Sequence, residues 1–240
     1  MVSGQLIREV VIDWSKIDEG SYLRGIPAIS GVGKIGFGHN VTFFVGENGS
    51  GKSTLLEAIA VAYGFNPEGG TRNYNFSTFD SHSELYRAIR ISRGFRRPDC
   101  GYYLRAESFY NVATKEDEYS RGPGGVPQHF HEKSHGESFL QLAQNSFRGN
   151  GIYLLDEPEA ALSPQRQLTL LVEIHRCAQE GAQFIIASHS PILLGIPGAE
   201  ILSFDSCAIH PVAYEETESY QVTEVFLNHR EQLLRRLLEE

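Results

Sequence analysis

The fold is decided by residues 41–62, VTFFVGENGSGKSTLLEAIAVA. The first five residues of this stretch are mainly apolar and β-branched or aromatic, which predicts a buried strand. Apolar residues then recur at helical spacing from Leu55 to Ala62, and Gly64 is a suitable stop, so a helix is expected there. Between strand and helix, Gly46 to Ser53 fit the pattern G-x-x-x-x-G-K-[ST], which requires both flanking elements.

This loop has the composition of a triphosphate-binding site. Its glycines allow backbone N–H groups to point inward at phosphate oxygens, and the helix that follows presents its positive dipole end to them. Lys52 can reach the β- and γ-phosphates, and the Ser53 hydroxyl can ligate Mg²⁺. The predicted nucleotide-binding residues are Gly46, Glu47, Asn48, Gly49, Ser50, Gly51, Lys52, Ser53 and Thr54.

Composition limits the class of protein. The 240 residues are 41% hydrophobic and 21% charged, which is enough for one sizeable core and favours a single domain. The net charge of −9 argues against nucleic acid as a partner, although a local basic patch would not be visible in that total. The three cysteines show neither metal nor disulfide spacing, and we find no signal peptide and no apolar run long enough for a membrane span. We therefore expect a cytoplasmic protein without a membrane span of its own.

The rest of the chain alternates strand and helix patterns. Alternating strands and helices predict an α/β fold with a mostly parallel sheet. Helices are expected near 134–143, from Pro164 to Gly181 and at 233–238, and strands at 6–14, 26–29, 34–35, 101–106, 152–157, 184–187 and 201–204. The two short strands would form an antiparallel flap, in which Tyr22 and Phe37 are candidates for base stacking or for ordinary packing. The arginines of residues 89–97 suit either a nucleic-acid or partner contact or a solvated strand edge.

Polar residues follow two of the predicted strands. Asp156 and Glu157 end one strand, and His189 follows the next. Because parallel sheets bind ligands beyond the carboxyl ends of their strands, we expect these residues to converge on the glycine loop. Asp156 would hold Mg²⁺ through its water shell, Glu157 would orient or deprotonate the attacking water, and His189 would hydrogen-bond the γ-phosphate or that water.

In these motifs the sequence resembles an ABC-type ATPase nucleotide-binding domain over residues 40–205. Gly46–Thr54 resembles Walker A, and Ile152–Glu157 resembles Walker B with its glutamate. Ser134-His-Gly-Glu137 is similar to the family signature, Ala161–Pro164 stands at the D-loop, and His189 at the switch histidine. Glu107 occupies the place of the Q-loop glutamine, where a carboxylate can still ligate Mg²⁺ or its water.

Departures from the family pattern favour one branch of it. Asp156-Glu-Pro-Glu159 has Glu where transporter subunits usually have Thr, and Glu137 stands where they have Gln. Both forms, and the Ser188–Pro191 loop, are more similar to soluble SMC/RecF-like and AAA-type predicted ATPases than to transporter subunits.

The resemblance implies a P-loop NTPase fold of the ABC type, with an antiparallel N-terminal flap and a small helical subdomain. We expect a single domain over residues 1–240, with about 83–148 contributing that subdomain. It also implies that catalysis is shared by two chains: Ser134 and Gly136 of one chain would cover the ATP held by Lys52 of the other. The predicted function is Mg²⁺-dependent ATP hydrolysis by an ATP-gated homodimer that switches an unidentified protein partner, with DNA maintenance or defence as candidate processes. The alternative is the cytoplasmic ATP-binding subunit of an ABC transporter.

Overall fold

Two sheets organise the part of the chain that the structure, a computed structural model, describes: residues 4–71, 83–105 and 135–238. Within it, seven strands form a sheet in the order β10-β9-β3-β8-β7-β6-β4, and three form a smaller sheet in the order β2-β1-β5. The strands are β1 (Ile7–Ile12), β2 (Lys34–Gly36), β3 (Val41–Val45), β4 (Gly70–Thr71), β5 (Ile89–Arg93), β6 (Cys100–Arg105), β7 (Gly151–Asp156), β8 (Gln183–Ala187), β9 (Glu200–Ser203) and β10 (His210–Pro211). The helices are α1 (Pro27–Ser30), α2 (Lys52–Tyr63), α4 (His135–Ser146), α5 (Pro164–Gln179), α6 (Pro191–Leu194) and α7 (Glu218–Leu238).

The five central strands of the larger sheet are parallel. β9, β3, β8, β7 and β6 pair in parallel, and β10 and β4 add antiparallel edges. Every residue of β3, β7 and β8 is buried, as expected for parallel strands covered on both faces. The mostly parallel α/β fold predicted from the sequence is therefore confirmed.

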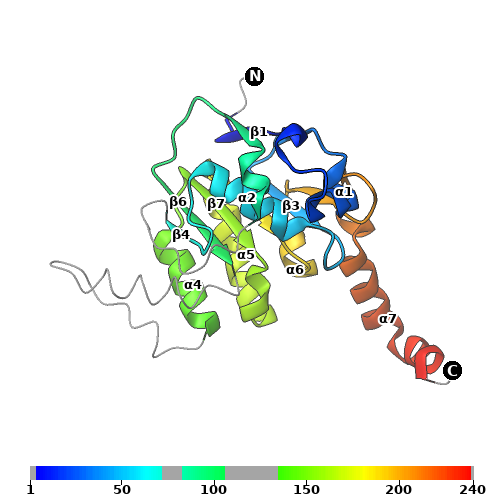
Figure 1. Cartoon of the computed structure of the whole chain (residues 1–240). Coiled ribbons are helices and arrows are strands. Elements are labelled where there is room, and N and C mark those ends of the chain that lie inside the picture. The colour runs from blue at the N-terminus through cyan, green and yellow to red at the C-terminus, as the bar shows by residue number, and fades with distance from the viewer. Residues whose placement is uncertain (1–3, 72–82, 106–134, 239–240) are drawn as a thin grey trace.

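Each face of the larger sheet supports its own core. On one face, Phe44, Leu154 and Ile185 pack with α2 and with the smaller sheet. On the other face, Phe43, Tyr153 and Ile186 pack with α4, α5 and α6. Figure 1 shows this layering, with α2 opposite α4, α5 and α6, and with α7 extending away from the body.

One buried side chain ties the two sheets together. Gln183, the first residue of β8, is 1% exposed. Its Nε2 donates to the carbonyl of Ile7 at 2.9 Å, and its Oε1 accepts from the N–H of Ile7 at 2.7 Å. A register shift in β1 between Ile7 and Glu9 lies beside this contact. The amide of Gln183 thus satisfies both backbone groups of a buried residue in the other sheet.

The N-terminal segment differs in part from the prediction. Residues 34–36 form a strand antiparallel to β1, as expected for a flap, but residues 27–30 form helix α1 because Pro27 is preorganised for a first helical position. Phe37 is a core residue whose ring lies 6.5 Å from that of Phe44, so it packs and does not offer a stacking face. Tyr22 is 64% exposed.

The proposed subdomain of about 83–148 remains a prediction. Its described residues include two strands, β5, which pairs with β1, and β6, which pairs with β7. They also include helix α4, which packs on α5. The arginines of β5 lie along a strand of the smaller sheet, and Arg90 forms an ion pair with Asp13.

We expect the substitution Gln183→Leu to lower the free energy of unfolding by about 2–4 kcal/mol, because the buried N–H and C=O of Ile7 would lose their partners. Urea denaturation measures this difference. Gln179→Leu, the same change at an exposed position of α5, is the control and should change stability by less than about 0.5 kcal/mol. Equal effects of the two substitutions would contradict the role given to Gln183.

Candidate nucleotide site

The glycine loop lies where the sequence placed it, between β3 and α2. Lys52, the first residue of α2, is 4% exposed, and its Nζ donates to the carbonyls of Gly46 and Glu47 at 2.6 and 2.8 Å. Gly51 precedes the helix with a φ of 100°, and a Cβ there would lie 2.4 Å from Ile29 of α1. The N-terminal segment therefore packs closely against the loop, and the side chain of Lys52 bonds back to the start of the loop.

Asp205 supports the start of the loop. Its Oδ1 accepts from the N–H of Glu47 at 2.7 Å, and its Oδ2 accepts from Ser203 at 3.2 Å. Gly46 has a φ of 138°, and a Cβ at this position would lie 2.7 Å from the same Oδ1. Asp205 was not among the predicted site residues, although it follows a strand that neighbours β3, which is the same positional signal that pointed to Asp156 and His189.

Ser53 and Asp156 meet, as predicted, at the carboxyl ends of their strands. The Ser53 hydroxyl donates to Asp156 Oδ1 at 2.8 Å. Asp156 Oδ2 lies 3.7 Å from Nε of Arg105, which also bonds Glu57 at 2.8 Å. Arg105 is opposite Asp156 in the register of β6 and β7, and this pairing of distant segments could not be read from the sequence. A hydroxyl and a carboxylate held this close suit the oxygen coordination of Mg²⁺.

The turn after β7 places Glu157 in an uncommon backbone conformation. Its φ and ψ are 49° and 51°, and among the described residues it is the only non-glycine with a positive φ. Its N–H donates to the carbonyl of Ala187 at 2.9 Å, so this turn is attached to the end of β8. Left-handed backbone at a non-glycine residue costs about 1–2 kcal/mol and is often found at functional sites.

Glu159 joins this turn to the His189 loop. Its Oε1 accepts from the Ser188 hydroxyl at 2.9 Å and from the N–H of His189 at 2.6 Å. Burial raises the pKa of this carboxyl, although its hydrogen bonds oppose the shift. Within the described part of the chain, Oε2 of Glu159 and Nε2 of His189 are buried and have no hydrogen-bond partner. The histidine ring thus has a free nitrogen at this edge of the sheet.

Charge at the site is dominated by carboxylates around one lysine. Burial lowers the pKa of Lys52, while Glu157, Asp205, Asp156 and Glu159 raise it, in that order of effect. Asp156, Glu157 and Glu159 lie at or just after the end of β7, and Asp205 lies just after β9, so the fold brings the ends of two strands together around Lys52. An ammonium group surrounded by acids, beside a glycine loop, is suited to contact a phosphate together with a divalent cation.

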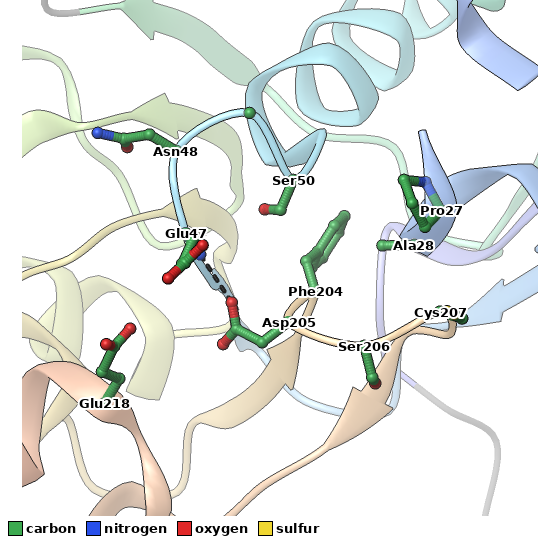
Figure 2. Close-up of a pocket in the computed structure, with 11 residues that line it drawn as sticks. Pro27, Ala28, Glu47, Asn48, Ser50, Phe204, Asp205, Ser206, Cys207 and Glu218 are labelled. Atoms are coloured by element: carbon green, nitrogen blue, oxygen red, sulfur yellow. Dashed lines mark hydrogen bonds between the residues drawn. The ribbon is translucent and has the colours of Figure 1, made fainter. Parts of the chain in front are cut away.

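A cavity of about 690 Å³ adjoins the tip of the loop (Figure 2). Glu47, Asp205 and Glu218 lie along one side of it, and Pro27, Ala28 and Phe204 lie along the other. Neither Tyr22 nor Phe37 lines it.

Three further site residues were predicted outside the segments described so far: Glu107, Ser134 and Gly136. Glu107 and Ser134 lie outside the described residues. Gly136 is in the first turn of α4, where a Cβ would lie 2.5 Å from the carbonyl of Ala161 and 2.9 Å from Arg166. Arg166 also pairs with Glu137 at 2.7 Å, so Gly136 and Glu137 pack against Ala161 and Arg166 of their own chain.

Comparisons with known proteins agree with the motifs. A family model described as "AAA domain" matches residues 22–134, and one described as "AAA domain, putative AbiEii toxin, Type IV TA system" matches residues 137–195. Together the two models take in the glycine loop, the Asp156–Glu159 turn and His189. The chain has an ABC-type ATPase domain related to that of the SMC proteins.

Two curated relatives resemble this ABC-type domain over part of their length. Structural maintenance of chromosomes protein 6 of Takifugu rubripes is 38% identical over 61 residues, which are 25% of this chain and 6% of that protein. The hemin import ATP-binding protein HmuV of Rhodopseudomonas palustris is 26% identical over 167 residues, which are 60% of this chain and 63% of that protein. The ABC-type domain therefore spans less than two thirds of either relative.

Solved structures with a similar arrangement include an SMC head domain and a transporter component. The SMC head domain from Thermotoga maritima has a TM-score of 0.47 at 16% identity, covering 87% of this chain and 100% of that one. CbiO1 from Clostridium perfringens, part of the transporter complex cbiONQ, has a TM-score of 0.49 at 16% identity, covering 98% and 100%. Every helix in the described parts of the ABC-type domain is too short or too polar to cross a membrane.

We expect Asp205→Ala to weaken the binding of a non-hydrolysable ATP analogue about tenfold, because the N–H of Glu47 would lose its acceptor at the start of the loop. Isothermal titration calorimetry measures the affinity. Asp205→Asn is the matched control, since its amide oxygen can still accept that hydrogen bond, and it should bind within about twofold of wild type. A tenfold loss in both variants would show that charge, and not support of the loop, is what Asp205 contributes.

Proposed function

We propose that this chain binds ATP with Mg²⁺ and hydrolyses it. The observation that carries the proposal is the contact between the Ser53 hydroxyl and Asp156 at 2.8 Å, directly beside Lys52 and Glu157. It joins the glycine loop to the end of β7 with the two oxygen groups that would hold Mg²⁺. When bound, Mg²⁺ supplies positive charge to the phosphate oxygens and so stabilises the charge that develops during phosphoryl transfer.

Residues of the chain would contact the phosphates and activate the attacking water. Lys52 would exchange the carbonyls of Gly46 and Glu47 for phosphate oxygens, while the backbone N–H groups of residues 51–54 would contact the phosphates. Glu157 would orient the attacking water and accept its proton, because its turn is held against β8. Nε2 of His189 would hydrogen-bond the γ-phosphate or that water.

We propose further that ATP is held between two copies of the chain. Gly136 packs against Ala161 and Arg166 and not in the Lys52 site of its own chain, which is consistent with the signature-like segment serving a facing subunit. Ser134 and Gly136 of the second copy would cover the γ-phosphate, and Glu107 would assist at Mg²⁺. Binding of ATP would then join two copies and hydrolysis would release them.

The biological role that we propose is an ATP-dependent switch acting on a protein partner in the cytoplasm. Similarity to a structural maintenance of chromosomes protein and to a model described as a toxin of a type IV TA system supports DNA maintenance or defence as the process. Direct binding of nucleic acid is not part of this proposal, because the net charge of −9 argues against it.

The second candidate is the ATP-binding subunit of a membrane transporter, which the similarity to HmuV favours. Glu159 argues for the first candidate, because transporter subunits resembling this family usually have Thr there, and Glu159 is used here to hold the His189 loop. Co-purification with a membrane-spanning protein would favour the transporter.

The decisive measurement is Mg²⁺-dependent ATPase activity as a function of protein concentration. We expect the rate per subunit to rise with concentration, because each site needs a second copy, and Glu157→Gln to lower the rate at least about 100-fold through loss of the general base. With ATP present, Glu157→Gln should form dimers detectable by light scattering, and Lys52→Ala should not. A rate independent of concentration would contradict the shared site, and binding of ATP without hydrolysis would contradict the enzyme.

Glu159 allows a separate test of how the His189 loop is positioned. Glu159→Ala should lower kcat about 10- to 100-fold and leave ATP affinity unchanged, because His189 would lose the acceptor that fixes its backbone. Glu159→Gln keeps that acceptor at Oε1 and should retain most of the activity. Equal loss in both variants would show that the carboxylate itself, and not its hydrogen bonds, is required.

A further inference from the structure

Four side chains at the Mg²⁺ end of the nucleotide site form a ring that begins and ends on α2. Ser53, in the first turn of α2, donates to Asp156 Oδ1 at 2.8 Å. Asp156 Oδ2 lies 3.7 Å from Nε of Arg105 on the neighbouring strand β6. Nη1 of Arg105 donates to Oε2 of Glu57 at 2.8 Å, and Glu57 is again a residue of α2. The function proposed above uses Ser53 and Asp156 but gives no role to Arg105 or Glu57.

The position of Glu57 follows from the sequence of α2. Glu57 is four residues after Ser53, and residues four apart lie on the same face of a helix. Glu57 is 9% exposed, and a buried carboxylate is costly unless it is paired and hydrogen-bonded. Both of its oxygens have partners, because Oε1 accepts from the N–H of Ser83 at 3.0 Å and Oε2 accepts from Arg105. Glu57 is therefore held in one orientation, with one oxygen directed at the guanidinium.

The two carboxylates beside Arg105 do not hold it equally. The 2.8 Å contact with Glu57 is a charge-assisted hydrogen bond, whereas 3.7 Å between Arg105 Nε and Asp156 Oδ2 is longer than a hydrogen bond. A shift of the guanidinium by about 1 Å would turn the second contact into a hydrogen bond as well. Asp156 is 6% exposed, so salt and water screen its attraction for Arg105 only weakly. The bond to Glu57 thus opposes closure of Arg105 on Asp156.

The gap between Arg105 and Asp156 bears directly on Mg²⁺. A guanidinium that is hydrogen-bonded to a carboxylate occupies its oxygens, and Mg²⁺ or its bound water requires those same oxygens. At 3.7 Å, Arg105 is near enough to offset the charge of buried Asp156 and too far to occupy Oδ2 through a hydrogen bond from Nε. Closing the gap would therefore weaken the binding of Mg²⁺.

We propose that Glu57 sets the Mg²⁺ affinity of the nucleotide site by holding Arg105 away from Asp156. Glu57 is then a positioning residue, because it acts on the metal site only through Arg105. This role rests on the proposed function, since it takes Asp156 to hold Mg²⁺ directly or through water. It goes further, because it assigns the strength of Mg²⁺ binding to a side chain of α2 that does not contact the metal.

The test measures how nucleotide binding depends on Mg²⁺, without turnover. A fluorescent, non-hydrolysable ATP analogue is bound to the full chain at increasing Mg²⁺ concentrations and also in EDTA. Glu57→Gln should raise the Mg²⁺ concentration for half-maximal binding at least about tenfold, because Arg105 loses its charged partner and bonds Asp156. Binding in EDTA should not weaken, since Lys52 and the glycine loop are unchanged. A site that was merely distorted would bind less in both conditions.

A double variant separates competition by Arg105 from loss of structure. Glu57→Gln with Arg105→Gln removes the guanidinium together with its partner, so half-maximal binding should return to within about threefold of the wild-type Mg²⁺ concentration. If Glu57 only supported the fold, the double variant would be at least as impaired as Glu57→Gln. Glu173→Gln is the matched control, because it removes a mostly buried carboxylate from an ion pair with Arg176 on α5, and it should leave the Mg²⁺ dependence unchanged.

Arg105→Gln alone keeps the test decisive if Glu57→Gln does not fold. Without the guanidinium no side chain at position 105 competes as a cation for Asp156, so half-maximal binding should require no more Mg²⁺ than in wild type. A higher requirement in this variant would overturn the proposal. Urea denaturation establishes which variants are folded.

Failure of this inference is distinguishable from failure of the proposed function. If wild type binds the analogue with Mg²⁺ and Glu57→Gln has the same Mg²⁺ dependence, or the double variant shows no recovery, the role of Glu57 is wrong and the ATP site stands. If wild type binds no analogue at any Mg²⁺ concentration, the proposed function is wrong and the role of Glu57 falls with it.

Discussion

The site depends on the parallel pairing of β3 with β8 and β9, and of β8 with β7. Parallel strands end at the same edge, so loops that are more than 100 residues apart in the sequence open side by side. The contact between Ser53 and Asp156, 103 positions apart, is the most direct result of this pairing. Antiparallel pairing of β3 and β8 would have sent His189 to the opposite edge, away from the glycine loop.

The geometry of that edge is then refined by hydrogen bonds between the loops. Asp205 bonds the N–H of Glu47, Glu157 bonds the end of β8, and Glu159 bonds the backbone of His189. Each bond joins a loop to the loop or strand beside it. The glycine loop, the Glu157 turn and the His189 loop are therefore one connected unit, in which a displacement of one loop must strain or break a bond to the next.

The two sheets are held in register by a single amide as well as by apolar packing. The smaller sheet packs on α2 and on one face of the larger sheet, and Gln183 fixes β1 at the level of Ile7. Ile29 of the same N-terminal segment packs so close to Gly51 that a Cβ there would lie 2.4 Å from it. A shift of the smaller sheet would therefore change the packing of the glycine loop. This arrangement links a structural amide far from the chemistry to the shape of the nucleotide site.

The sequence by itself determined the glycine loop, the buried strands and the residues at their ends, because strand and helix periodicity and the chemistry of phosphate binding are local properties. It did not reveal that Asp205 bonds the glycine loop, that Arg105 lies beside Asp156 or that Glu159 bonds the backbone of His189. Each of these contacts depends on which strands are neighbours and in what register. It was also wrong about residues 26–29, and it left open whether Phe37 stacks on a base or packs in the core. Pro27 favours a first helical position, which made residues 27–30 a helix. The ring of Phe44, which only the folded chain brings next to Phe37, makes Phe37 a core residue.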